Sequence, residues 1–156
     1  MKHANRFCWA AALLVTVGLL GCQAEKEDKP AAADDLQKMA GTWTLAAGEQ
    51  DGAPLPEEVV KNGKLTIVGD AYTVELGELG VKKGTQKIDA TKSPKQIDAQ
   101  DAAGPTVGLN LGIYEFTADG DFRVCFAATG KDRPTEFATK ADSGHFMHLW
   151  RRAKAE

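Results

Sequence analysis

The sequence predicts an all-β domain, an antiparallel up-and-down barrel of about eight strands with one or two short helices. Two observations carry this prediction. Short segments in which apolar and polar residues alternate recur at regular spacing after residue 40, and clusters of Gly, Pro, Asp and Asn separate them. A two-sheet sandwich fits the same pattern. Closure is the economical arrangement because a barrel leaves no exposed strand edges, and its interior is filled by side chains or holds one small ligand.

The amino-terminal residues 1–21 have the features of an export signal. Lys2 and Arg6 precede the uncharged run of residues 7–20, and Gly21 and Cys22 follow it. A transmembrane helix is the alternative, but this run is shorter than the roughly 18 to 20 apolar residues that span a bilayer, and no basic cluster follows it. We therefore expect residues 1–21 to be removed as a signal peptide.

Leu19-Leu20-Gly21-Cys22 resembles the lipobox of bacterial lipoproteins. The resemblance implies that Cys22 carries diacylglycerol, becomes the first residue of the mature chain and is acylated on its amino group, for example by palmitate. Several acyl chains form a stable membrane anchor, since each buried CH₂ contributes about 0.8 kcal/mol. It also implies a lipid-anchored location in the cell envelope, facing the periplasm or the exterior. Gln23, in place of the Asp that retains enteric lipoproteins at the inner membrane, favours the outer membrane.

The segment after the lipobox is expected to be a tether. Residues 22–35 contain Pro30, alanines and mixed charges but no large apolar side chain, so folding would not offset the loss of chain entropy. The remaining residues 36–156 are then one barrel domain, because a mature chain of this length holds one core but not two.

Charge and cysteine content exclude several classes of protein. The formal net charge falls from −3 to −5 when Lys2 and Arg6 leave with the signal. No basic patch with interleaved aromatic residues is present, so we expect no nucleic-acid partner. Cys8 leaves with the signal and Cys22 carries lipid, which leaves Cys125 as the one thiol. No intramolecular disulfide can form, and stability must come from packing.

The clearest strand pair is residues 109–126, where two β-rich runs flank Asp119-Gly120. Phe122, Val124 and Phe126 alternate with polar neighbours and give this hairpin one apolar face. Asp-Gly supplies the positive φ angles of a tight turn. The other predicted strands are residues 41–45, 64–68, 71–75, 81–88, 95–99 and 145–152.

Two short helices accompany the strands. Asp34 or Asp35 is placed to cap a helical turn over residues 36–39. Residues 56–61 form the second, with Pro56 in the first turn and Glu57 and Glu58 near its positive end. This second helix can close one end of the barrel.

Gly41-Thr42-Trp43 on the first strand, with Arg151 or Arg152 on the last, resembles the lipocalin and calycin arrangement. There a glycine-x-tryptophan opens the barrel, and a late arginine packs over the indole in a cation–π contact that closes the barrel end. Over residues 36–154 the chain also resembles an uncharacterised lipocalin-like family abundant in planctomycete bacteria. The resembling motifs include Leu55-Pro56-Glu57-Glu58, Gly112-Ile113-Tyr114-Glu115 and Arg133-Pro134-Thr135-Glu136-Phe137. The resemblance implies a secreted or lipid-anchored barrel and names no ligand.

Candidate catalytic chemistry is sparse. Cys125 is the one candidate nucleophile, and His145 and His148 are the mature histidines. Residues three apart on a strand face opposite sides, so at most one of these histidines shares a face with any site. A thiol between Val124 and Phe126 more often acts as a small hydrophobic side chain. We therefore expect no catalytic residue, no metal site and no cofactor.

Candidate contact residues are Tyr72, Tyr114, Arg133 and Glu136. The tyrosines, with other strand aromatics, either line a ligand pocket or are core. Arg133 and Glu136 either form a recognition loop at the barrel mouth or, as the favoured interpretation, a weak surface pair beside a turn fixed by Pro134.

These patterns favour a non-enzymatic, lipid-anchored envelope protein that binds a small apolar ligand or a partner protein of the envelope, in or on its barrel. A solid-core interaction or inhibitor module acting through its loops is the alternative. A thiol-dependent enzyme using Cys125 is the least favoured hypothesis.

Overall fold

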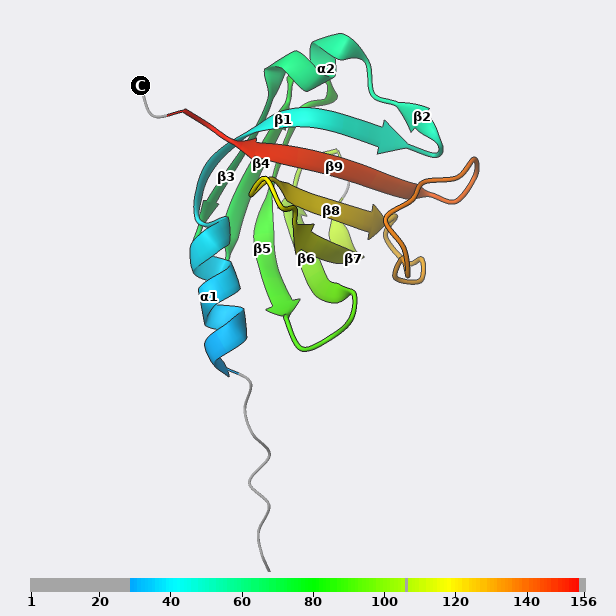
Figure 1. Cartoon of the computed structure of the whole chain (residues 1–156). Coiled ribbons are helices and arrows are strands. Elements are labelled where there is room, and N and C mark those ends of the chain that lie inside the picture. Colours follow the sequence, from blue (N-terminus) through cyan, green and yellow to red (C-terminus); the bar gives the residue numbers. More distant parts are fainter. Residues whose placement is uncertain (1–28, 106, 155–156) are drawn as a thin grey trace, which may run out of the picture.

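The computed structural model describes residues 29–105 and 107–154 (Figure 1). The expected signal peptide and the lipidation site at Cys22 lie outside these residues. The helical elements are α1 (Lys29–Met39), α2 (Glu57–Asn62) and the 3₁₀ turn η1 (Gly77–Leu79). The strands are β1 (Gly41–Gln50), β2 (Ala53–Pro54), β3 (Gly63–Val68), β4 (Ala71–Leu76), β5 (Val81–Asp89), β6 (Lys95–Ala103), β7 (Gly108–Phe116), β8 (Phe122–Ala127) and β9 (His145–Arg152).

The described strands form one antiparallel sheet in which β1 and β3 to β9 pair with their neighbours in chain order. β1 also pairs with β9, from Trp43 opposite Arg152 to Gln50 opposite Phe146, with an irregularity between Leu45 and Ala47. This pairing closes the sheet into an eight-stranded barrel, and β2 is an extra short strand beside β1. The predicted all-β barrel is confirmed, and the sandwich alternative is wrong.

The barrel has two different ends. We call the base the end where β1 begins, β9 ends and α1 packs, and the mouth the opposite end, where α2, η1 and the β6–β7 and β8–β9 loops lie (Figure 1). Because the strands alternate in direction, successive hairpin loops lie alternately at the base and at the mouth.

The half of the barrel near the base is tightly packed. Its side chains are almost completely buried, and the largest are Met39, Trp43, Tyr114, Phe122 and Trp150. The Trp43 indole N–H donates to the Met39 carbonyl at 2.8 Å, and its ring contacts Phe122 with 5.8 Å between centroids. Burying each such side chain stabilises the fold by about 1.5 to 3 kcal/mol.

Helix α1 starts earlier than the sequence predicts. It includes residues 29–35, which we assigned to the tether, and Asp34 and Asp35 lie inside it instead of capping it. The reason is tertiary: the Asp35 side chain is buried and accepts hydrogen bonds from Lys95 at 2.6 Å and from Tyr114 at 2.9 Å. Helix α2 follows Pro56 as predicted.

The predicted hairpin of residues 109–126 corresponds to β7 and β8, with Phe122 and Val124 buried in the core. Its turn differs from the expectation. Residues 117–121 form a five-residue loop in which the Thr117 N–H donates to the Asp121 carbonyl at 2.9 Å. Gly120 has a positive φ of 82°, but Asp119 does not, so this is not a two-residue turn with two positive φ angles.

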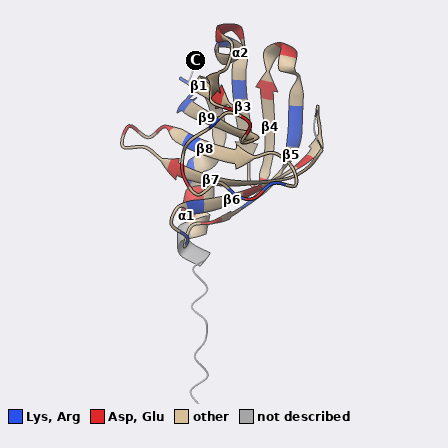
Figure 2. Cartoon of the chain, turned by 90° about the vertical axis from the view of Figure 1, so that its right-hand side faces the viewer, with Lys and Arg blue, Asp and Glu red and all other residues tan. Residues whose placement is uncertain are grey.

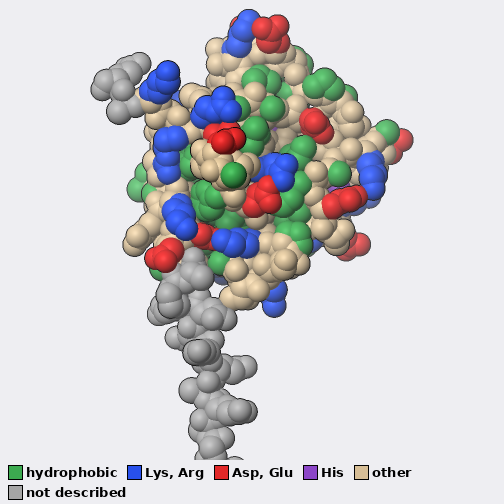
Figure 3. All heavy atoms as spheres, viewed as in Figure 1, with side chains coloured by type: hydrophobic (Ala, Val, Ile, Leu, Met, Phe, Trp, Pro, Cys, Tyr) green, Lys and Arg blue, Asp and Glu red, His purple; other side chains and the backbone are tan. Residues whose placement is uncertain are grey.

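No helix within the described residues is long and apolar enough to cross a membrane. Basic and acidic residues are mixed along the strands in the view of Figure 2. The face in Figure 3 likewise shows both signs of charge around hydrophobic side chains.

Candidate ligand cavity

The half of the barrel near the mouth encloses a cavity of about 580 Å³. Its apolar lining includes Leu65, Ile97 and Val124, whereas Gln50 at the end of β1 and the loop residues Pro105 and Thr129 line it near the mouth. Cavities of roughly 300 to 1,000 Å³ with mainly apolar walls and a few polar groups are typical small-molecule sites. The barrel is therefore packed at its base and hollow toward its mouth.

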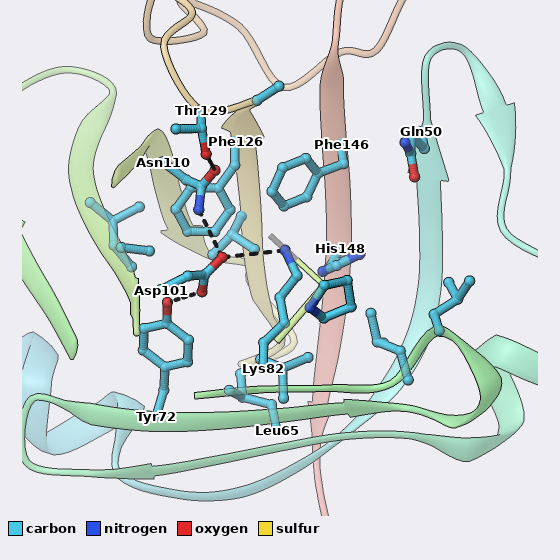
Figure 4. Close-up of a pocket in the computed structure, with 18 of the residues that line it drawn as sticks. Gln50, Leu65, Tyr72, Lys82, Asp101, Asn110, Phe126, Thr129, Phe146 and His148 are labelled. Carbon is cyan, nitrogen blue, oxygen red and sulfur yellow. Dashed lines mark hydrogen bonds and ion pairs between the residues drawn. The ribbon is translucent and has the colours of Figure 1, made fainter. Parts of the chain in front are cut away.

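One wall of the cavity is aromatic (Figure 4). The inward side chains of β9, Phe146, His148 and Trp150, contact one another in sequence, with ring centroids 5.7 Å and then 5.4 Å apart. Phe126 on β8 stacks on Phe146 at 5.5 Å. These residues share a face because side chains two positions apart on a strand point the same way.

A group of hydrogen-bonded side chains lies across from this wall, and we call it the polar cluster: Tyr72, Lys82, Asp101, Asn110 and Thr129 (Figure 4). At its centre is the Asp101 carboxylate, which is buried. Asp101 accepts hydrogen bonds from the Tyr72 hydroxyl, from Asn110 Nδ2 at 2.9 Å and from the Lys82 ammonium at 3.3 Å. The Thr129 hydroxyl donates to Asn110 Oδ1 at 3.1 Å. The cluster thus supplies fixed polar atoms to an otherwise apolar cavity.

Gly84 on β5 makes the Tyr72–Asp101 contact possible. Tyr72 on β4 and Asp101 on β6 are separated by β5, and Gly84 is opposite both of them in the register. A Cβ atom at residue 84 would lie 2.6 Å from the Tyr72 hydroxyl oxygen and 2.1 Å from the Gln100 carbonyl oxygen. A glycine inside a strand is a sequence signal for such a close approach, and it marks this site.

The cavity changes the acid–base properties of its walls. Burial, together with the nearby Asp101 carboxylate, raises the pKa of the Tyr72 hydroxyl far above its usual value, so Tyr72 is a neutral hydrogen-bond donor. Burial and the Lys82 ammonium lower the pKa of His148 to about 4. His148 is therefore uncharged near neutral pH.

The predicted contact residues do not meet at one site. Tyr72 lines the cavity, but Tyr114 lies in the packed half, bonded to Asp35. The expected Arg133–Glu136 pair is wrong, because Arg133 binds Asp98 at 2.5 Å whereas Glu136 binds Lys140 at 2.8 Å.

Arg133 also lies away from the mouth, on the outer face of the barrel. Its guanidinium donates to the carbonyl oxygens of Ile97 at 3.0 Å and Gly112 at 2.6 Å, which are opposite one another on β6 and β7. These contacts hold the long β8–β9 loop against the sheet. The interpretation of Arg133 as a mouth residue is therefore wrong.

The residues expected to close the barrel are found at its base. The Arg152 guanidinium carbon lies 3.8 Å from the centroid of the Trp43 ring, and Arg152 also donates to the carbonyl oxygens of Lys38 and Ala40, each at 2.5 Å. Of the two candidate arginines, Arg152 makes the indole contact. Arg151 binds Asp121 at 2.9 Å instead.

Cys125 lies on the outer face of β8, beneath the β8–β9 loop, and is completely buried. Its thiol contacts the Ala138 carbonyl oxygen at 3.7 Å, and burial raises the pKa of the thiol to about 11. His148 faces the cavity on the other side of the sheet. Across residues 29–105 and 107–154, no three His, Cys, Asp or Glu side chains are close enough to hold a metal ion.

The described residues therefore define a closed eight-stranded antiparallel β-barrel with an internal cavity that carries a buried polar cluster. Comparison of the chain with protein-family models, with curated proteins and with solved structures finds no match in any of the three.

Proposed function

We propose that this chain is a lipid-anchored protein of the cell envelope whose lipocalin-like barrel binds a small, mainly apolar ligand in the cavity. The cavity of about 580 Å³ beside the β9 aromatic wall is the observation that carries the proposal. Aromatic and aliphatic walls favour apolar ligands because binding removes apolar surface from water. The polar cluster supplies the few hydrogen bonds that orient such a ligand.

The alternatives have less support. A solid-core interaction module requires a filled barrel, whereas only the half near the base is packed. A thiol-dependent enzyme requires an accessible thiolate, and Cys125 is buried with a raised pKa. A non-enzymatic binding role remains the best-supported function.

Fluorescence of the neutral apolar probe N-phenylnaphthylamine tests ligand binding. Val74 lines the cavity, and Thr73 is its neighbour on β4 with the opposite orientation. We expect the wild-type protein to enhance the probe fluorescence, Val74→Trp to abolish most of this enhancement by filling the cavity, and Thr73→Trp to retain it. Circular dichroism checks that both variants fold. No enhancement by the wild type, or equal loss in both variants, would contradict the proposal.

The anchor is tested separately in cells. Labelling with a palmitate analogue should mark the wild-type protein and place it in the membrane fraction, whereas Cys22→Ser should lose the label and the membrane association. Labelling that persists in Cys22→Ser would disprove lipidation at this residue. Separation of the inner from the outer membrane then tests the proposed outer-membrane location.

A further inference from the structure

The charged side chains of the cavity form a pair. Three donors converge on the two Asp101 oxygens, an arrangement suited to an ionised carboxylate, which only accepts hydrogen bonds. The Lys82 ammonium lies 3.3 Å from Asp101 Oδ2 and 5.5 Å from the centroid of the Phe146 ring. One negative and one positive charge thus lie side by side on the cavity wall.

The rest of the described lining adds no net charge to this inner region. His148 is neutral near neutral pH because its pKa is about 4. The remaining charged lining residue is Asp51, which comes from the β1–β2 turn at the mouth, where its carboxylate accepts a hydrogen bond from the Gly144 N–H at 2.6 Å. The described side chains of the inner cavity therefore make it polar on one side and sum to no net charge.

This neutrality limits what the cavity can bind favourably. An anionic ligand that approached Lys82 would compete with Asp101 and leave one uncompensated negative charge buried in the barrel. A cationic ligand at Asp101 would leave an uncompensated positive charge. Burial of an unpaired charge is costly, whereas a neutral group that exchanges hydrogen bonds with the pair carries no such penalty.

The positions of the polar and apolar side chains predict the orientation of a bound ligand. Asp101, Asn110 and Thr129 of the polar cluster lie toward the mouth, where Thr129 is exposed, while the apolar side chains of Ile97 and Val124 line the cavity nearer the base. A bound molecule would bury its apolar part toward the packed core and leave its polar group beside Asp101 and Lys82.

We infer that the cavity selects an uncharged amphipathic molecule, an apolar chain or ring system with a hydroxyl or carbonyl group placed at the polar cluster, over a charged molecule of the same size. This inference rests on the proposed function and adds the chemical class of the ligand.

Three probes with one chain length and different head groups test the inference: decanol, decanoate and decylammonium. The protein used is the whole chain that remains after removal of residues 1–21. Binding of each probe is measured by displacement of N-phenylnaphthylamine near neutral pH, below the concentrations at which the probes aggregate. We expect decanol to bind at least about tenfold more tightly than either ion.

Two variants should reverse this preference. Lys82→Met leaves the Asp101 carboxylate without its cationic partner, so decylammonium should become the tightest of the three probes. Asp101→Asn keeps a side chain of similar shape but removes the negative charge beside Lys82, so decanoate should become the tightest. Thr85→Ala on the outer face of β5 is the matched control and should keep the wild-type order.

The outcomes separate this inference from the proposed function. If neither the fluorescent probe nor any decyl compound binds the wild type, the proposed function fails. If the compounds bind and decanoate or decylammonium binds as tightly as decanol, the cavity function stands and the inference is overturned. The order of the three affinities in the wild type tests the inference even if one variant fails to fold.

Discussion

The Tyr114 hydroxyl donates a hydrogen bond to Asp35 Oδ2 at 2.9 Å, although the two residues are 79 positions apart. Lys95 binds the same oxygen at 2.6 Å, so α1 is fixed to β6 and β7 at the base of the barrel. A helix held in this way seals the packed end and leaves the cavity to open at the mouth.

Replacing Asp35 with alanine should destabilise the protein by about 1 to 3 kcal/mol, because the buried Tyr114 hydroxyl would lose its acceptor. Urea unfolding measures the change. Asp34→Ala, at an exposed position on the same helix, is the control and should alter the free energy of unfolding by less than about 0.5 kcal/mol. Equal effects of the two variants would contradict the account of α1.

The contribution of Asp35 should depend on pH. Burial acts to raise the pKa of Asp35, but hydrogen bonds and attraction from Lys95, with the Tyr114 hydrogen bond, outweigh it and hold the pKa below its usual value of 3.8. A lowered pKa in the folded state means that the stabilisation is complete above the unfolded value and is lost as the pH falls through the folded value. The difference in unfolding free energy between wild type and Asp35→Ala should therefore shrink below about pH 4. A difference that stays constant on acidification would exclude this role.

Much of the fold could be predicted from the sequence because each strand carries its own alternation and turn residues. The polar cluster could not. Lys82 and Asp101 occupy positions that, strand by strand, look like ordinary solvent-facing polar residues, and only the register of β4, β5 and β6 brings them into the barrel with Tyr72. Gly84 was the one local sign of the cluster. A glycine within a predicted strand indicates that side chains of the two flanking strands, here Tyr72 and Asp101, can approach each other over it.

The contacts of Arg133 could not be predicted from the sequence either. The motif that contains it was distinctive, but no local pattern reveals that its guanidinium binds two carbonyl oxygens and Asp98 on strands more than 20 residues earlier. The Trp43 and Arg152 contact was predictable because it came with a family resemblance; the choice of Arg152 over Arg151 needed the register of β9.

Gly84→Ala should disrupt the polar cluster. The new Cβ atom would lie 2.6 Å from the Tyr72 hydroxyl oxygen and 2.1 Å from the Gln100 carbonyl oxygen, so the Tyr72 ring and β6 could not both keep their positions. We expect a destabilisation of about 1 to 3 kcal/mol and weaker binding of the fluorescent probe. Thr85→Ala, one residue along the strand and facing outward, should leave both measurements close to wild type. Unchanged binding in Gly84→Ala would show that the cluster geometry does not matter to the cavity.

The two neighbouring arginines at the end of β9 should differ in their effect on stability. Arg152→Ala removes the contact with Trp43 and two hydrogen bonds to backbone carbonyls, and should cost about 1 to 2 kcal/mol in urea unfolding. Arg151→Ala removes the ion pair between an exposed guanidinium and the Asp121 carboxylate and should cost about 0 to 1 kcal/mol. The reverse order would contradict barrel closure by Arg152.

Arg133 should control access to Cys125. In a variant with Cys8 and Cys22 replaced by serine, the remaining thiol should react slowly with a thiol-specific reagent because it is buried and its pKa is about 11. Arg133→Ala should release the β8–β9 loop and accelerate the reaction about tenfold, by lowering the free energy of local opening by about 1.4 kcal/mol. Glu136→Ala should not change the rate, since Glu136 binds Lys140 at the surface. A fast reaction in the parent protein would revive the thiol-enzyme hypothesis.

The central claim is that the hollow half of the barrel holds a ligand, and native mass spectrometry tests it most directly. The protein purified from its source envelope is compared with the same protein after unfolding and refolding. We predict a reproducible additional mass on the native sample that is absent after refolding and belongs to an uncharged, mainly apolar molecule. The mass of the lipidated polypeptide alone in both samples, together with no uptake of decanol or N-phenylnaphthylamine by the refolded protein, would contradict the account.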